Sequence, residues 1–310
     1  MPVENTEPTH AVVFPGQGSQ FPGMADPWSE HPASRAVLDE AARALGDDLV
    51  AGCSDEAKLA TTAFVQPALL AIGVAAYRVL EAEGVRAAGV AGHSLGEFAA
   101  LVAAGVLPLA EALDAVIVRG RAMQRAGDER PGTMAALLGV GPEGAAVICD
   151  ETRGDDVLVV ANANSPVQVV ISGSVPAIER AEALAKERKI RAVRLNVAGA
   201  FHSPLMEPAV RPIVERLSSI AFTAPAFPIA ENVSGELEDD PDRLRELLGR
   251  HVISPVRWDS GVRALEEAGA TTFLEAGAGD VLTKLAKRVV PRARALAVGS
   301  PQVVRDILRA

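Results

Sequence analysis

Cysteine and an excess of positive charge are what this sequence lacks. Its 310 residues include only two cysteines, Cys53 and Cys149, which are too few for a disulfide framework and are interpreted as buried thiols. Acidic residues outnumber basic ones by 40 to 30, for a formal net charge of −10. Because nucleic acid binding requires a basic face, we expect no nucleic acid partner.

The sequence also lacks a recognisable leader or membrane span. The first ten residues, MPVENTEPTH, have no apolar segment of the kind that a secretory signal carries. An apolar stretch near residues 99–118 is interrupted by Pro108, Glu111 and Asp114, so we expect it not to cross a membrane. These absences predict a cytoplasmic protein, in which the 49% of apolar residues can form a large core.

What the sequence does contain is a G-x-S-x-G pentapeptide from Gly92 to Gly96. It follows a predicted strand at 85–91 and precedes a predicted helix at 97–107, which is the arrangement of a nucleophile elbow. The serine hydroxyl then lies at a helix N-terminus, where the helix dipole and free N–H groups favour negative charge. We predict that Ser94 is a nucleophile; the alternative is a tight-turn serine without chemistry.

Strands and helices alternate on both sides of this elbow. The segment HAVVFPG predicts a buried strand that ends in a turn, and residues 26–62 show only weak periodicity, typical of short helices and loops. Further helices are predicted at 67–84, 109–127, 207–220 and 241–252, with strands near 227–235 and 271–279. Such alternation indicates an α/β fold with a parallel sheet covered on both faces.

A charged linker at 127–132 precedes a different pattern. Strands at 133–140, 155–164, 165–173 and 190–198 and helices at 142–154 and 174–189 give the order βαββαβ, the ferredoxin-like split unit. We therefore predict a small inserted subdomain at 130–198. The large subdomain consists of residues 10–129 and 199–310.

A serine nucleophile requires a base, which is usually histidine near neutral pH. His202, in the loop GAFHSPLM after the small subdomain, is the best of five candidates, although a loop or capping role is the alternative. Of the other four, His10 lies in the polar tail and His31 in a loop. His93 is adjacent to the serine, where it is expected to support the turn, and His251 lies at a helix end.

Two further features fit acyl chemistry. The loop at 14–20, FPGQGSQ, could bring a backbone N–H to a reacting carbonyl, and the N–H of Leu95 could complete an oxyanion hole; a plain turn is the alternative. Arg119 lies in an apolar helical segment, where a guanidinium requires a carboxylate. That carboxylate belongs either to a substrate or to an internal Asp or Glu.

Together these motifs resemble the malonyl-CoA:acyl carrier protein transacylase family, which includes polyketide synthase acyltransferase domains. The resemblance covers nearly the whole chain, in order: FPGQGSQ (14–20), Gln66-Pro67, GHSLGEF (92–98), Val118-Arg119-Gly120, NANSPVQVVISG (162–173), GAFHSPLM (199–206), Asn232-Val233, SPVRW (254–258) and FLEAGAGDVL (273–282). It implies an α/β-hydrolase-like large subdomain with a ferredoxin-like insertion.

The resemblance implies a role for each matching residue. Ser94 would be acylated and His202 would be its base, oriented by a backbone carbonyl near His251, while Gln17 and Leu95 would supply the oxyanion-hole N–H groups. Arg119 would pair with a malonyl carboxylate. The substrate site would further include Gln66, Phe201, Asn162, Asn164 and His251. Leu95 and Phe201 resemble the version of the family that selects malonyl over methylmalonyl.

The implied reaction is ping-pong, with acyl-CoA and phosphopantetheinyl acyl carrier protein as substrates and with no bound cofactor or metal. We expect a monomer that binds the acidic carrier through basic residues Lys284, Lys287, Arg288, Arg292 and Arg294. Two positions depart from the family: His251 replaces the usual Gln, and Gly277-Ala278-Gly279-Asp280 replaces Gly-Pro-Gly-Lys.

Three other functions stay open at this point. The first is a polyketide acyltransferase for a non-malonyl group, possibly acting between two carrier proteins. The second is a hydrolase of carrier-bound thioesters, although related hydrolases tend to lack the arginine at position 119. The third is a non-catalytic carrier-binding protein.

Overall fold

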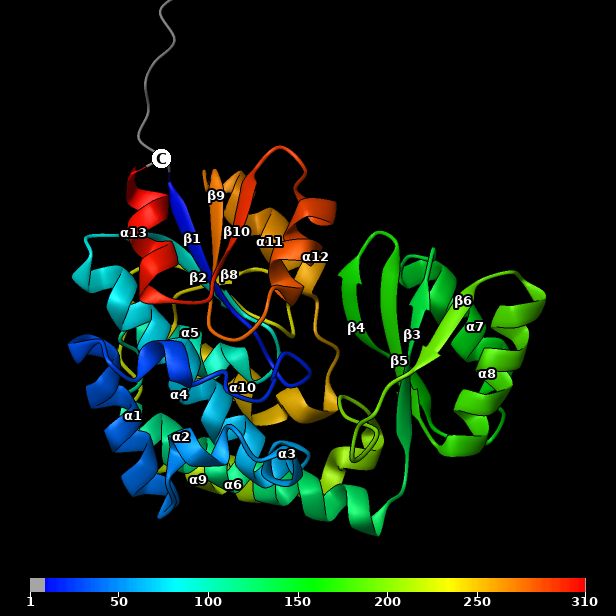
Figure 1. Cartoon of the computed structure of the whole chain (residues 1–310). Helices are drawn as coiled ribbons and strands as arrows, with labels where there is room; N and C mark the ends of the chain where they lie inside the picture. The colour runs from blue at the N-terminus through cyan, green and yellow to red at the C-terminus, as the bar shows by residue number, and fades with distance from the viewer. Residues whose placement is uncertain (1–8, 310) are drawn as a thin grey trace, which may run out of the picture.

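A computed structural model describes residues 9–309, which form two lobes with one β-sheet each (Figure 1). The larger lobe contains both the first and the last of the described residues, and the smaller lobe is built from the middle of the chain. Most of the polar N-terminal segment considered above, residues 1–8, lies outside the described residues.

The large lobe is centred on a six-stranded sheet of order β10-β9-β1-β2-β7-β8. Its pairs are parallel except for β7 with β8. Alternate residues of β1 (His10–Phe14) point into two cores: Val12 and Phe14 into one, Ala11 and Val13 into the other. The prediction of a parallel sheet covered on both faces is thus confirmed. The other strands are β2 (Ala87–Gly92), β7 (Ile229–Ala230), β8 (Leu237–Glu238), β9 (Thr272–Ala276) and β10 (Arg294–Val298).

Helix α4 (Thr62–Ala82) is the central helix of the first core and contacts α1, α5 and α6. It is long and apolar enough to cross a membrane, but 89% of its most apolar window is buried inside the fold, which is how a core helix packs. Around the sheet lie α1 (Pro32–Leu45), α2 (Leu49–Gly52), α3 (Glu56–Leu59), α5 (Gly96–Ala103), α6 (Leu109–Glu129), α9 (Glu207–Ser218), α10 (Pro241–Arg250), α11 (Trp258–Glu267), α12 (Val281–Val289) and α13 (Pro301–Arg309), with 3₁₀ turns η1 (Asp26–Trp28), η2 (Pro204–Met206) and η3 (His251–Ile253).

Residues 26–62 contain more helix than their weak periodicity predicts. Helix α1 has 14 residues and starts at Pro32. Proline is favourable at this position because the first helical turn leaves its N–H groups unpaired and proline has none. The helix is capped by Gly46, whose φ of 66° is left-handed. Its N-cap is His31, whose Nδ1 accepts from the Ala33 N–H at 3.2 Å. Histidine is not among the preferred N-cap residues, so this helix start carried little signal. The predicted linker at 127–132 was also partly wrong, because α6 continues to Glu129.

The small lobe has the predicted order of elements. Its strands form an antiparallel sheet of order β4-β5-β3-β6, the ferredoxin-like arrangement. The core between this sheet and its two helices is apolar and includes Ile148, Ile171 and Ile178. The elements are β3 (Thr133–Leu138), α7 (Pro142–Thr152), β4 (Leu158–Ser165), β5 (Gln168–Gly173), α8 (Val175–Glu187) and β6 (Arg191–Arg194).

Backbone contacts connect the two lobes. The Ala163 N–H donates to the Val256 carbonyl and the Val256 N–H donates to Ala161, both at 2.8 Å, so the segment after η3 pairs with strand β4. Where the chain leaves and re-enters the large lobe, a Cβ on Gly127 would lie 2.4 Å from the Ala198 oxygen. The Asn164 Oδ1, near the end of β4, lies 2.8 Å from the Nε2 of His93, which places the end of this strand beside the nucleophile elbow.

Candidate active site

The nucleophile elbow has the strained geometry that its sequence predicts. Ser94 has a φ of 51°, a left-handed value that is unfavourable for a non-glycine residue. A Cβ on Gly92 would lie 1.9 Å from the backbone of Gly96, and a Cβ on Gly96 would lie 2.1 Å from the Phe14 oxygen. Both glycines are therefore required by packing, and the turn holds the Ser94 hydroxyl at the start of α5.

An asparagine that is distant in the sequence, Asn232, bridges the backbone of the elbow. The Asn232 side chain donates from Nδ2 to the Gly92 carbonyl at 2.7 Å, and its Oδ1 accepts from the Ser94 N–H at 2.9 Å. Asn232 follows β7, 138 residues after Ser94. Sequence reasoning used it only as a motif match, because no local signal shows which turn a distant side chain will hold.

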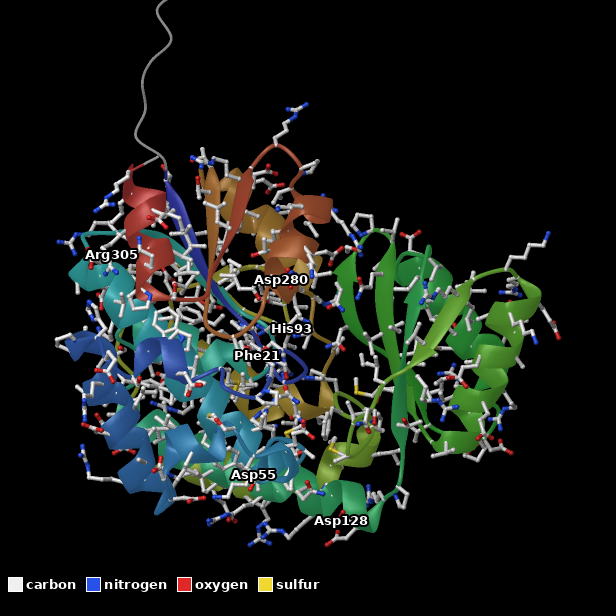
Figure 2. All side chains as sticks on the ribbon, viewed as in Figure 1. Phe21, Asp55, His93, Asp128, Asp280 and Arg305 are labelled. Carbon is white, nitrogen blue, oxygen red and sulfur yellow. The ribbon has the colours of Figure 1, made fainter. Side chains whose placement is uncertain are left out.

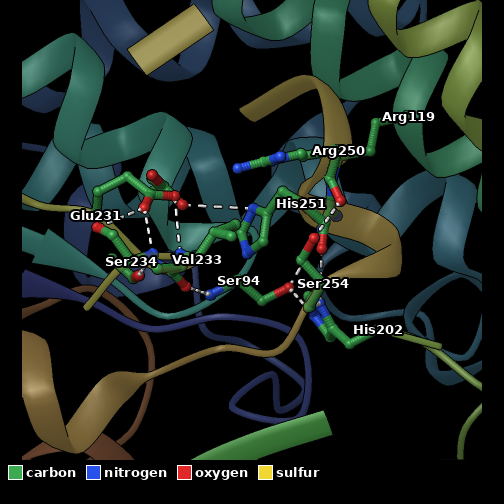
Figure 3. A network of polar contacts seen from close by, with 12 residues as sticks. Ser94, Arg119, His202, Glu231, Val233, Ser234, Arg250, His251 and Ser254 are labelled. Atoms are coloured by element: carbon green, nitrogen blue, oxygen red, sulfur yellow. Dashed lines mark hydrogen bonds and ion pairs between the residues drawn. The ribbon is translucent and has the colours of Figure 1, made fainter. Parts of the chain in front are cut away.

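His202 is hydrogen-bonded to the nucleophile, with its Nε2 2.8 Å from the Ser94 Oγ (Figure 3). Its Nδ1 lies 3.1 Å from the His251 carbonyl and 3.0 Å from the Ser254 carbonyl. Since carbonyls only accept, Nδ1 carries the proton and Nε2 is free to accept one from Ser94. Burial, and then the nearby Arg119 charge, lower the pKa of His202 to about 3. The imidazole is therefore neutral, is oriented by two carbonyls, and can accept a proton from Ser94.

The buried guanidinium of Arg119 contacts the same serine. It is 1% exposed, donates to the Gln66 Oε1 at 2.6 Å and to the Ser94 Oγ at 3.1 Å. Within residues 9–309 no carboxylate lies within ion-pair distance of it. Burial lowers the pKa of Arg119 to about 10, while the more distant Glu97 acts in the opposite direction. A buried cation without an ion-pair partner is well suited to bind a carboxylate.

The oxyanion-hole candidates flank the hydroxyl. Gln17 and Leu95 both line the cavity that contains Ser94. Neither backbone N–H donates a hydrogen bond to the part of the chain that the structure describes. A Cβ on Gly16 would lie 2.3 Å from the His93 oxygen, so the 15–18 loop contacts the elbow directly. Both N–H groups are thus without a hydrogen-bond acceptor among the described residues, as an oxyanion hole would require.

The cavity at Ser94 is small, about 90 Å³. Besides the polar residues above, apolar side chains enclose it: Met123, Met134, Leu195, Val197 and Phe201. A second cavity of about 190 Å³ shares Gln17, His93, Asn162 and Leu195 with the first and continues between the sheet of the small lobe and α12. His93 and Asp280 lie on the side of the large lobe that faces β4 (Figure 2). The site therefore has an inner pocket and an outer channel between the lobes.

Of the other residues predicted to contact the substrate, the two asparagines line the cavities and His251 does not. Asn162 lines both cavities, whereas Asn164 lines only the outer one, where its Oδ1 lies 2.8 Å from the His93 Nε2. His251 does not fit its predicted place among substrate contacts. Its side chain is fully buried behind His202 and lines neither cavity, so only its backbone carbonyl faces the reacting groups.

The predicted basic cluster is partly occupied by internal contacts. Lys284 is 2.7 Å from Asp280 on the same helix turn, and Arg288 donates to Gln168 of the small lobe at 2.9 Å. Asp280, one of the two departures from the family pattern, thus reduces the positive charge on this face.

An acyl transferase domain family model matches residues 11–303. The chain belongs to the acyl transferase domain family. This acyl transferase is 42% identical over 305 residues to the malonyl CoA-acyl carrier protein transacylase of Escherichia coli K12, covering 96% of this chain and 98% of that protein. The predicted family is confirmed.

Solved structures confirm the fold of this acyl transferase. A malonyl-CoA:acyl carrier protein transacylase from Xanthomonas oryzae superposes with a TM-score of 0.93 at 42% identity, covering 98% of each chain. A malonyl transacylase in complex with its type II polyketide synthase acyl carrier protein has a TM-score of 0.93 at 38% identity, covering 97% and 99%. The α/β class with a second, antiparallel subdomain is confirmed; the boundaries at residues 130 and 198 stay predictions.

Proposed function

We propose that this acyl transferase moves a malonyl group from coenzyme A to the phosphopantetheine thiol of an acyl carrier protein. The observation that carries the proposal is Arg119. Its guanidinium is buried, has no carboxylate partner among the described residues, and lies 3.1 Å from the nucleophile in a pocket of about 90 Å³. A carboxylated acyl group attached to Ser94 would supply the missing counter-charge.

The first half-reaction forms an acyl-enzyme. The Ser94 oxygen attacks the thioester carbonyl while its proton passes to His202 Nε2, and the N–H groups of Gln17 and Leu95 stabilise the oxyanion. The carbon–sulfur bond then breaks, and the coenzyme A thiolate takes the proton from His202. In the second half-reaction the carrier thiol gives its proton to His202, attacks the ester carbonyl, and releases the Ser94 oxygen, which regains the proton.

The two carbonyls on His202 Nδ1 take the place of a third acidic residue. They keep Nδ1 protonated and stabilise the imidazolium that forms during each attack, because their negative ends point at it. A formal negative charge at this position would also pair with Arg119 and compete with the malonyl carboxylate. Neutral acceptors support the base without that competition.

The remaining roles follow from the two cavities. We assign Gln66 to hold Arg119, Phe201 to limit the width of the inner pocket, and Asn162 and Asn164 to contact the pantetheine arm in the outer channel. The carrier would approach the outer end of this channel, near the basic residues of α12. A monomeric state, the absence of a cofactor and a cytoplasmic location stay predictions.

Loading of Ser94 from different donors tests the proposal. Wild type and Arg119→Ala are mixed with malonyl-CoA or acetyl-CoA, and the acyl-enzyme is followed by intact-protein mass spectrometry. We expect malonyl loading to fall roughly 100-fold or more, as for loss of one partner of a buried charge pair, with acetyl loading preserved. Equal losses for both donors would make Arg119 structural.

The acceptor is tested with the same acyl-enzyme. The half-life of malonyl-Ser94 is measured with buffer alone and with a phosphopantetheinylated carrier protein. Transfer predicts slow loss in buffer and rapid loss with the carrier, accompanied by a malonyl mass on the carrier. Equally rapid loss in buffer would indicate a hydrolase instead.

A further inference from the structure

Three buried glutamates lie at the end of the large sheet that carries the elbow, and one differs from the others. Glu231 accepts from the backbone N–H groups of Val233 at 2.8 Å and Ser234 at 2.7 Å, and Glu275 likewise accepts from residues 282 and 283. Glu97 is 1% exposed, and its Oε2 has no hydrogen-bond donor in good geometry within the described chain. A buried carboxyl oxygen in this condition requires another partner.

The nearest candidate is His251. Its Nδ1 lies 3.3 Å from the Glu97 Oε2, its side chain is fully buried, and neither ring nitrogen has another partner among the described residues. Figure 3 marks the contact of the His251 ring with a dashed line. Two unpartnered groups that face each other, one able to donate and one able to accept, can satisfy each other by sharing one proton.

This contact connects the two halves of the catalytic site. Glu97 is in the first turn of α5, three residues after Ser94. His251 supplies the carbonyl at 3.1 Å from the His202 Nδ1, and its ring centroid lies 5.1 Å from that of His202. A displacement of the 251–254 backbone would therefore move the acceptors that orient the base.

We propose that Glu97 and His251 form one neutral hydrogen-bonded pair that fixes the 251–254 backbone against the elbow helix and so positions His202 for proton transfer. Both are positioning residues, since neither touches the reacting atoms. The proposal concerns the acyl transfer proposed above and rests on the roles assigned there to Ser94 and His202.

The surrounding charges favour the neutral form. Burial and the neighbouring Glu231 raise the pKa of Glu97 well above its usual range, although a backbone hydrogen bond from Asn232 opposes this. Burial, followed by His202, Arg119 and His93, keeps the pKa of His251 well below its usual range. An imidazolium at position 251 would also repel the one that forms on His202. The contact between the two residues therefore depends on a hydrogen bond and not on charge. Glutamine at either position should preserve it.

Two substitution series test this. Glu97→Gln and His251→Gln keep a hydrogen-bonding side chain, whereas Glu97→Leu and His251→Leu remove it. The readouts are kcat and KM for malonyl transfer and the rate of Ser94 inactivation by methanesulfonyl fluoride. In that inactivation the serine oxygen displaces fluoride from sulfur and its proton passes to His202, so it reports on the base without requiring a malonyl group.

We expect the Gln variants to stay within about 3-fold of wild type in kcat. Each Leu variant should lose about 10- to 100-fold in kcat and in inactivation rate, the scale of a misplaced catalytic group, with KM changed by less than about 3-fold. The double Leu variant should be no slower than the slower single variant, because both remove the same contact. Gln variants as slow as Leu variants, or Leu losses that multiply, would overturn the proposal.

Controls separate positioning from stability and from substrate choice. Ser34→Ala removes a buried hydrogen bond to the Trp28 carbonyl far from the site and should lower the melting temperature without changing kcat. If the Leu variants do not fold, Glu97→Asp decides: its shorter side chain opens the contact, and an unchanged inactivation rate would reject the pair. Wild type that reacts with methanesulfonyl fluoride but not with malonyl-CoA would reject the proposed function while leaving this inference testable.

Discussion

Ser94 and His202 lie 2.8 Å apart, but different forces hold them. Ser94 is fixed by the close backbone packing of Gly92 against the turn and of Gly96 against Phe14 of β1, where no atom can be added. His202 is fixed by hydrogen bonds that its Nδ1–H donates to carbonyls 49 and 52 residues further along the chain. Both residues have a left-handed φ, 51° for Ser94 and 58° for His202, but the position of Ser94 depends mainly on close backbone packing and that of His202 on how distant segments meet. Substitutions that affect one half should differ in kind from those that affect the other.

The largest effect is expected from the base itself. His202→Ala should lower kcat/KM for malonyl loading about 10²- to 10⁴-fold, the contribution of a general base, since Arg119 and the oxyanion-hole N–H groups remain. The melting temperature should change little, because this half of the site does not determine the shape of the elbow. Stopped-flow or mass-spectrometric loading rates together with thermal unfolding provide the measurement. A loss of fold in this variant would show that the loop of His202 is also a structural support.

The elbow should respond in the opposite way. In Gly96→Ala the new Cβ would lie 2.1 Å from the Phe14 carbonyl, so β1 or the turn must move. We expect a loss of about 1–3 kcal/mol in the free energy of unfolding, typical of overpacking, together with a loss of activity. Urea denaturation measures the first quantity. Gly105→Ala is a useful comparison, since that glycine has a φ of 77° but open space around it, and it should destabilise without reducing kcat.

The same difference explains which residues could be predicted from the sequence. The role proposed for Ser94 depends on five consecutive residues, and the strands and helices of the small lobe follow from local alternation, so both could be inferred. His202 could be proposed only as a loop histidine. Asn232 was missed as a support of the elbow because its hydrogen bonds are made 138 residues away.

His251 shows a second limit. A residue letter does not tell whether the side chain or the backbone carbonyl faces a site, and here only the carbonyl does. Helix α1 was missed for a related reason: its histidine N-cap is an uncommon start signal. The sequence therefore did not determine contacts between distant segments, or helix starts that use an uncommon N-cap residue.

The smallest expected effect is on the free energy of unfolding at acidic pH. It comes from His251, which supports His202. Burial holds the pKa of His251 well below 6.5 in the folded protein, so the unfolded chain binds this proton first. The contribution of His251 to stability is thus present above pH 6.5 and is lost as the pH falls below that value. His251→Gln removes this titration, and the free energy of unfolding of the protein that keeps His251 should fall more steeply than that of the variant, by up to about 1.4 kcal/mol per pH unit.

Urea denaturation of both proteins at pH 8.5, 7.5, 6.0 and 5.0 measures the difference. Other groups titrate too, and the raised pKa of Glu275 acts with the opposite sign, but most of its contribution cancels when the two proteins are compared. Glu97 contacts His251 and is coupled to it, so both proteins carry Glu97→Gln, which removes the Glu97 titration. The slopes should coincide between pH 7.5 and 8.5 and separate below pH 6.5. Parallel curves throughout would mean that the folded protein already accepts a proton at His251. In that case the support of His202 would be charged, and the neutral pair inferred above would be wrong.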